Sequence, residues 1–173
     1  IKSSLLMSKA SSLYRCLSKT MFSTKDLLTL LNNEICETAS RGMFVTMLIG
    51  VYDSKKKEIL LSNAGHEPPL VLSSDGKFTS FIDAGPPLGI QKKIIYQENV
   101  LPFSSSSMYI FTDGITEIKD PSNRMLGADG FKLFIKKHQK VSNNQRLKTI
   151  VDDVILSGKI QKDDLTILVV DGN

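Results

Sequence analysis

Residues 107–117 read SMYIFTDGITE. The part from Met108 to Thr112 is apolar, aromatic or β-branched and contains neither glycine nor proline, which predicts a buried strand. Asp113 and Gly114 end that strand. A carboxylate at the end of a buried strand, followed by a glycine that permits a sharp turn, can present an oxygen ligand at the margin of a sheet.

The same combination occurs in reverse order near the C-terminus, where Asp163 and Asp164 precede an apolar run over residues 165–170. If the two strands are neighbours, their carboxylates meet at one edge of the sheet. Carboxylate oxygens are ligands that Mg²⁺ and Mn²⁺ prefer, and two such ions can activate water for attack on a phosphoryl group. Taken singly, an ordinary turn at Asp113 and a solvated loop at Asp163 are alternative interpretations.

Length and composition indicate a single soluble domain over residues 1–173. The chain is 41% hydrophobic, and its longest apolar run, residues 43–52, has the length of a strand, too short for a membrane span. A formal net charge of +4 without a basic stripe argues against nucleic acid as a partner. No signal peptide is recognisable, so we expect a cytoplasmic protein.

The hydrophobic periodicity changes along the chain in the manner of an α+β fold with segregated helices. Helical spacing covers residues 3–18, a segment starting at the capping residues 23–24, residues 128–137, and a segment that follows the capping residue Ser142. Strand patterns cover residues 43–52, 58–62, 70–72, 77–82, 94–100, 108–112 and 163–170. Residues 63–69 and 85–89 are expected to be loops, because glycine and proline interrupt them.

Four motifs occur in a fixed order: NAGHEPP at residues 63–69, GPPLG at 85–89, FTDGITE at 111–117 and DDLTILVV at 163–170. Together with SSLLMS at residues 3–8, they resemble the SpoIIE/RsbU-type branch of the PPM family, the metal-dependent bacterial serine/threonine protein phosphatases. The resemblance covers nearly the whole chain. It implies an αββα sandwich of antiparallel sheets flanked by helices, with two Mn²⁺ or Mg²⁺ ions at one edge.

The resemblance also implies an activity and a partner. Members hydrolyse phosphoserine or phosphothreonine by direct attack of metal-activated water, typically on a STAS-domain anti-anti-sigma protein in a partner-switching pathway of sigma-factor regulation. An upstream sensor or receiver domain in the native chain and a homodimer are compatible with the family.

Individual residues acquire roles through the same resemblance. Asp113 and Asp163 match the metal aspartates on which catalysis depends, and Asp164 lies second in the D-D-x-T motif, where we expect a supporting position in the metal site. The residues expected to shape the site are Gly114, Asn63, Gly65, His66 and Gly89.

One departure from the family pattern concerns the N-terminal metal motifs. The family places further aspartates upstream of its first helix, in a G-D-(F/W)-x-D-like strand and a D-x-S-G-H-G turn, and neither motif is present here. We therefore expect an N-terminally truncated domain that holds the C-terminal part of the site. A non-catalytic relative and a site completed by another chain are the two alternatives.

Two other functions compete with a phosphatase. The first is a catalytically incomplete, phosphatase-like module for interaction or dimerisation. The second is an unrelated phosphoryl-transfer enzyme with an aspartate nucleophile, but that class places its aspartate after an early parallel strand, and the hairpin-rich order here argues against it.

Overall fold

The computed structural model describes residues 2–38, 42–80, 84–158 and 164–172. The chain forms two compact units, one comprising Ile1–Pro68 and Phe81–Ser104, the other Pro69–Ser80 and Ser105–Asn173. The single domain over residues 1–173 stays a prediction. Within the described residues, no helix combines the length and the apolar character that crossing a membrane requires.

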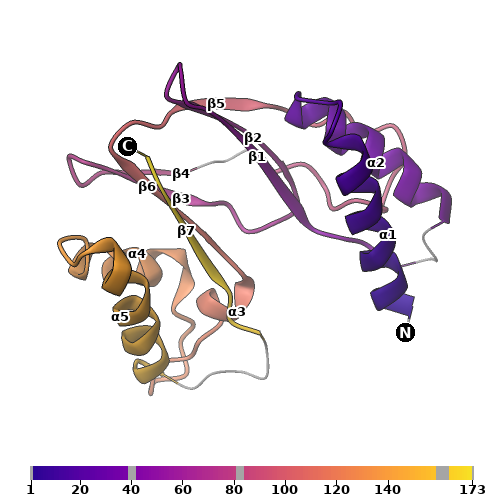
Figure 1. Ribbon diagram of the computed structural model, residues 1–173. Helices are drawn as coiled ribbons and strands as arrows, with labels where there is room; N and C mark the ends of the chain where they lie inside the picture. The colour runs from indigo at the N-terminus through magenta and orange to yellow at the C-terminus, as the bar shows by residue number, and fades with distance from the viewer. Residues whose placement is uncertain (1, 39–41, 81–83, 159–163, 173) are drawn as a thin grey trace. The chain divides into compact units, whose positions relative to one another are not determined.

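The first unit contains two helices and a three-stranded antiparallel sheet (Figure 1). Its elements are α1 (Lys2–Leu17), α2 (Thr24–Thr38), β1 (Met47–Asp53), β2 (Glu58–Ala64) and β5 (Asn99–Pro102). The sheet has the order β1-β2-β5. β1 and β2 form the predicted hairpin, with Asp53 opposite Glu58.

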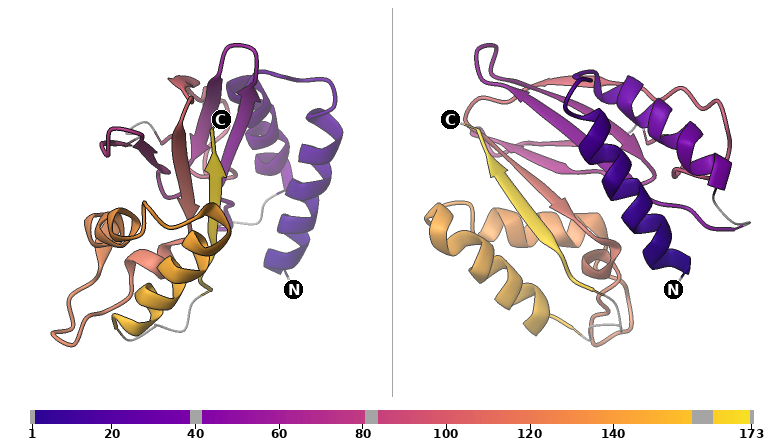
Figure 2. Two further views of the ribbon diagram at one scale, coloured as in Figure 1. Left: turned by 60° about the vertical axis from the view of Figure 1, so that its left-hand side comes forward. Right: turned by 45° about the vertical axis from the view of Figure 1, so that its right-hand side comes forward.

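A hydrophobic core joins the helices of the first unit to its sheet. Leu28, Leu31 and Ile35 of α2 are fully buried and pack with Ile49 of β1. Their spacing of three and four residues places them on one helical face, as expected for an amphipathic helix. α1 lies alongside α2 in every view (Figures 1 and 2).

The second unit contains a four-stranded antiparallel sheet of order β4-β3-β6-β7 and three helices. The strands are β3 (Leu70–Ser73), β4 (Phe78–Ser80), β6 (Ser106–Phe111) and β7 (Ile167–Asp171), and the helices are α3 (Asp113–Thr116), α4 (Gly127–Lys137) and α5 (Asn143–Leu156). Leu72, Tyr109 and Phe111 of this sheet share a buried core with Phe131 of α4 and Ile150 of α5. α4 and α5 therefore cover the same face of the sheet.

The predicted helices and the order of hairpins are confirmed, but several predicted strand boundaries are wrong. β7 begins at Ile167 and not at residue 163. β1 begins at Met47, not at Met43, because Val45 forms an isolated bridge with Leu88 instead. Asn63 and Ala64 belong to β2 and not to the loop that follows it. β5 begins at Asn99 and not at residue 94.

The misplaced start of β5 has a physical cause. The backbone N–H of Lys93 donates to Asn33 Oδ1 at 2.9 Å, and that of Tyr96 donates to Thr29 Oγ1 at 3.4 Å. Side chains of α2 thus occupy N–H groups that a strand would pair with its neighbour. An alternating pattern cannot reveal this competition.

Candidate functional site at the β6–β7 edge

The two strands that carry the predicted site aspartates are direct neighbours. β6 and β7 pair antiparallel, with Phe111 opposite Ile167 and Met108 opposite Val170. The last residue of β6 and the first of β7 therefore lie at the same edge of the sheet. The condition stated from the sequence, that the two strands be neighbours, is therefore met, and the sequence segments after Phe111 and before Ile167 meet there.

Thr112 connects the two segments beyond the regular ladder. Its backbone N–H donates to the carbonyl oxygen of Thr166 at 3.1 Å. Its hydroxyl donates to the carbonyl oxygen of Asp164 at 2.9 Å and accepts from the N–H of Thr166 at 3.0 Å. Sequence reasoning treated Thr112 only as the end of a strand. A hydroxyl directly before an Asp-Gly pair is the signal that could have identified this role.

Asp113 begins the short helix α3 and is exposed. Its Oδ1 accepts a hydrogen bond from the N–H of Gly114 at 3.0 Å, which orients the carboxylate at the start of the helix. Its carbonyl oxygen accepts from the N–H of Glu117 at 2.9 Å and from Thr116 Oγ1 at 3.0 Å. The Asp113 side chain therefore lies at the sheet edge, and the hydrogen bonds to its carbonyl oxygen hold its backbone in α3.

Gly114 is needed for a reason other than the expected turn. It is buried, and its φ angle is not in the left-handed region. A Cβ atom at this position would lie 2.7 Å from the carbonyl oxygen of Asp164 and 3.2 Å from Leu165 Cδ2. The absent side chain thus allows α3 to approach the segment that leads into β7.

The carboxylates available at this edge are Asp113 and Asp164, because Asp163 lies outside the described residues. Both described side chains are exposed at the edge. Among the described parts of the chain, no three His, Cys, Asp or Glu side chains gather in a way that could hold a metal ion. Mg²⁺ is commonly bound through one or two carboxylates and several waters, so this donor set fits part of such a site.

Asn63 and His66 lie in the first unit, where they close a loop. Asn63 Oδ1 accepts from the N–H of His66 at 2.8 Å, and Asn63 Nδ2 donates to the carbonyl oxygen of His66 at 2.9 Å. The His66 ring contacts the carbonyl oxygen of Glu67 through Nδ1 at 2.9 Å. These contacts are those of a loop held together by its own polar groups.

Gly65 and Gly89 both have positive φ angles, +70° and +94°. A Cβ atom at Gly65 would also lie 2.5 Å from Pro87 Cγ, so the two predicted loops of the first unit approach each other closely. The N–H of Gly89 donates to Asn32 Oδ1 at 3.0 Å, which ties its loop to α2. The placement of both glycines near a metal site stays a prediction.

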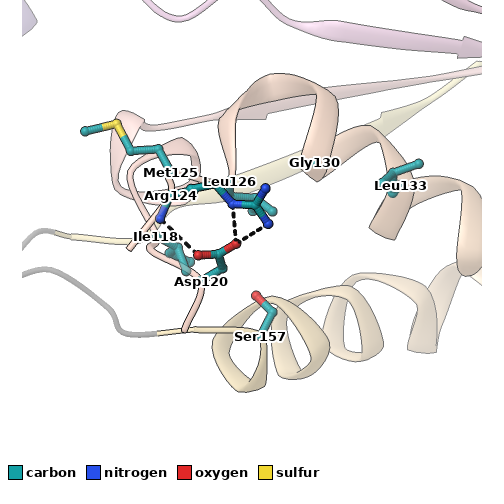
Figure 3. A pocket seen from close by; sticks show the side chains of 8 residues that line it. All are labelled: Ile118, Asp120, Arg124, Met125, Leu126, Gly130, Leu133 and Ser157. Atoms are coloured by element: carbon teal, nitrogen blue, oxygen red, sulfur yellow. Dashed lines mark hydrogen bonds and ion pairs between the residues drawn. The ribbon is translucent and has the colours of Figure 1, made fainter. Parts of the chain in front are cut away.

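One described cavity does not involve these residues. It has a volume of about 420 Å³, lies in the second unit, and is lined by Ile118, Asp120, Arg124, Met125, Leu126, Gly130, Leu133 and Ser157 (Figure 3). Its charged pair is explained by the loop: Asp120 Oδ1 accepts from the backbone N–H of Arg124 at 2.9 Å, and Oδ2 accepts from its Nε at 3.1 Å. The pair closes residues 120–124 and offers no catalytic arrangement.

Residues 1–173 match a protein family described as Stage II sporulation protein E (SpoIIE). Two curated relatives are similar in sequence. Protein IcfG of Synechocystis is 28% identical over 142 residues, which are 78% of this chain and 22% of IcfG. Phosphoserine phosphatase RsbU of Bacillus subtilis is 27% identical over 172 residues, which are 98% of this chain and 51% of RsbU. The chain therefore spans about half or less of these relatives.

Solved structures show the same fold. The SiaA-PP2C domain of Pseudomonas aeruginosa has a TM-score of 0.80 at 15% identity, over 98% of this chain and 69% of that one. The catalytic domain of the serine/threonine protein phosphatase PstP in complex with two manganese ions has a TM-score of 0.69 at 10% identity, over 97% of this chain and 80% of that one. The likeness confirms the predicted α+β fold class.

Proposed function

We propose, since this chain belongs to the SpoIIE family of PP2C-type protein phosphatase domains, that it contributes Asp113, Asp163 and Asp164 to a divalent-metal site that hydrolyses phosphoserine or phosphothreonine. The observation that carries the proposal is the pairing of β6 with β7, which brings the segments holding Asp113 and Asp164 to one sheet edge. The manganese complex of the similar PstP domain supports the choice of metal.

Each residue at the edge has a distinct task in this proposal. Asp113 and Asp163 supply ligand oxygens, and Asp164 supports them from the adjacent position. Thr112 holds the two segments together through the hydrogen bonds of its hydroxyl. When bound, divalent ions supply positive charge that lowers the pKa of water and neutralises the phosphoryl oxygens.

The substrate we propose is a phosphorylated STAS-domain protein in a bacterial partner-switching pathway. The support is the similarity to a protein named phosphoserine phosphatase and to a solved structure of the RsbU and RsbW domains of Rv1364c from Mycobacterium tuberculosis. We further propose that segments of the native protein outside this chain supply the other metal ligands of the family.

The test is Mn²⁺-dependent hydrolysis of p-nitrophenyl phosphate and of a phosphorylated STAS protein. This chain is compared with a version extended upstream to include the missing family motifs, each with and without Asp113→Asn. The proposal is supported if the extended protein is active and Asp113→Asn abolishes that activity. A folded extended protein that leaves both substrates intact in Mn²⁺ and in Mg²⁺ contradicts it and favours the interaction module.

A further inference from the structure

α5 carries a second apolar stripe beside the one that forms the core. Ile150 and Val154 are fully buried against the sheet. Leu147, Val151 and Ile155 follow one another at intervals of four residues, which places them on a common face next to the core stripe. This second stripe is only partly covered, and Ile155 is 39% exposed. A helix that only packs on a sheet normally has polar residues at such positions.

The second stripe forms one wall of a cavity of about 280 Å³. The remaining wall comes from α3 and from the segment that leads into β7. The described residues that line the cavity are Ile115, Leu147, Val151, Val154, Ile155, Leu165, Thr166 and Ile167. All of these residues belong to the second unit. We name this cavity the α5 pocket.

The chemistry of the lining restricts what the α5 pocket can accept. Among the described residues that line it, Thr166 is the one with a polar side chain. Pockets for drug-sized molecules are typically roughly 300–1,000 Å³ and carry several polar groups that orient the ligand. The α5 pocket is smaller, and its described lining carries a single polar side chain, so an aliphatic side chain suits it better than a free polar molecule.

The lining of the α5 pocket includes residues that adjoin the candidate site along the chain. Ile115 belongs to α3, the helix that Asp113 begins, and Leu165 follows Asp164 directly in the chain. The hydrogen bonds between Thr112 and residues 164 and 166 fix the two walls relative to the carboxylate edge. A protein bound with a phosphoryl group at this edge therefore has neighbouring residues beside the pocket.

We propose that the α5 pocket is a docking site for a large aliphatic side chain of the phosphoprotein substrate, close in sequence to its phosphorylated serine or threonine. This inference rests on the proposed phosphatase function. It assigns substrate selection to Val151 and Ile155, which lie outside the metal site. An apolar surface left uncovered next to a reactive edge is a common property of sites that bind other proteins.

The experiment measures binding and hydrolysis separately in the full-length native protein. The binding probes are fluorescent peptides with a non-hydrolysable phosphonate in place of phosphoserine. Each peptide carries either Leu or Ser at one of the four positions before or the four positions after the phosphonate residue. Since each residue of an extended peptide spans roughly 3.3 Å, the series samples a range of distances from the edge. We expect Leu at one or two positions to bind about tenfold more tightly than Ser.

The variants are Val151→Thr, which keeps the side-chain shape, and Ile155→Ser. The matched control is Leu156→Ser, because Leu156 neighbours Ile155 on α5 but is 83% exposed and does not line the pocket. We expect the preference for Leu to disappear in both pocket variants and to persist in the control. Hydrolysis of p-nitrophenyl phosphate should be unchanged in all three, and thermal unfolding checks that they fold.

Two results overturn the inference: no position shows a preference for Leu, or the preference persists in both pocket variants. Failure of the proposed function has a different signature. A protein that does not hydrolyse p-nitrophenyl phosphate, yet binds Leu-containing phosphonate peptides preferentially through Val151 and Ile155, retains the docking site without the catalytic activity.

Discussion

A Cβ atom placed on Gly114 would lie 2.7 Å from the backbone carbonyl oxygen of Asp164. Backbone atoms cannot move aside as a flexible side chain can, so Gly114→Ala must displace α3 or the segment entering β7. We expect it to destabilise the protein by about 1–3 kcal/mol, the usual cost of overpacking, and to reduce Mn²⁺-dependent hydrolysis. Urea unfolding and the p-nitrophenyl phosphate assay measure the two effects.

Gly130→Ala is the control for this substitution. Gly130 lies in α4, and the nearest atom to its added Cβ would be Leu126 Cδ1, the flexible end of a side chain. Alanine also favours helix by about 0.5–1 kcal/mol over glycine. Gly130→Ala should therefore be close to neutral, and an equal loss of stability in both variants would contradict the role of the Gly114–Asp164 approach.

Asn63→Ala should destabilise the loop that follows β2. The side chain is 5% exposed and makes two hydrogen bonds with the backbone of His66. Its removal leaves a partly buried N–H and a partly buried carbonyl of His66 without this partner, at a cost of about 1–3 kcal/mol. Chemical denaturation measures this. Asn33→Ala, which removes one exposed contact with the Lys93 N–H, should cost less, and the reverse order would refute the assignment.

Asp153 should make stability depend on acid pH. Hydrogen bonds from Lys137 and then His138 lower the pKa of its carboxyl below 3.8. Because the folded protein holds the ionised form more strongly than the unfolded chain, this contribution is present above pH 3.8 and is lost as pH falls through the lower folded pKa. Unfolding free energies of wild type and Asp153→Asn should differ at pH 6, and the difference should shrink as the pH falls below 3.8.

Asp152→Asn is the matched control, because Asp152 is the exposed neighbour of Asp153 on α5. Its difference from wild type should vary less across the same pH range. If Asp153→Asn also keeps a constant difference from wild type between pH 6 and pH 3, the contacts with Lys137 and His138 do not stabilise the fold through the ionised carboxylate.

The three aspartates should differ in their effect on hydrolysis in the extended protein. Asp113→Asn and Asp163→Asn should each abolish Mn²⁺-dependent activity, because each removes a proposed ligand. Asp164→Asn should reduce it by about 10–100-fold, the range found for residues that support metal ligands. Initial rates measured across a Mn²⁺ titration test this order. An Asp113→Asn variant that keeps wild-type activity would contradict the metal site.

The sequence predicted best what depends on local periodicity. The helical spacing of Leu28, Leu31 and Ile35 predicted α2, and the apolar run after Asp164 predicted β7. The sequence raised the neighbouring positions of β6 and β7 as a condition for a shared site, because carboxylates follow one strand and precede the other. The sequence did not predict the register of the two strands, since an apolar strand can pair with its neighbour at several offsets.

The sequence could not show which backbone groups are taken by distant side chains. Thr29 and Asn33 of α2 remove N–H groups from the region where a strand was predicted. Gly114 illustrates a similar limit, because a glycine in a T-D-G motif suggests conformational freedom, while its actual role depends on how closely Asp164 approaches it. Both features arise from tertiary contacts.

The pairing of Phe111 with Ile167 has a consequence for synthesis of the chain on the ribosome. The carboxylate edge cannot exist until residue 167 has emerged and β7 has added to β6. Until then, the backbone N–H and C=O groups along one side of β6 lack their partner, and such an edge invites pairing with other chains. The edge of β6 therefore stays unpaired until β7 is available, and the folding chain depends on rapid pairing of these two strands.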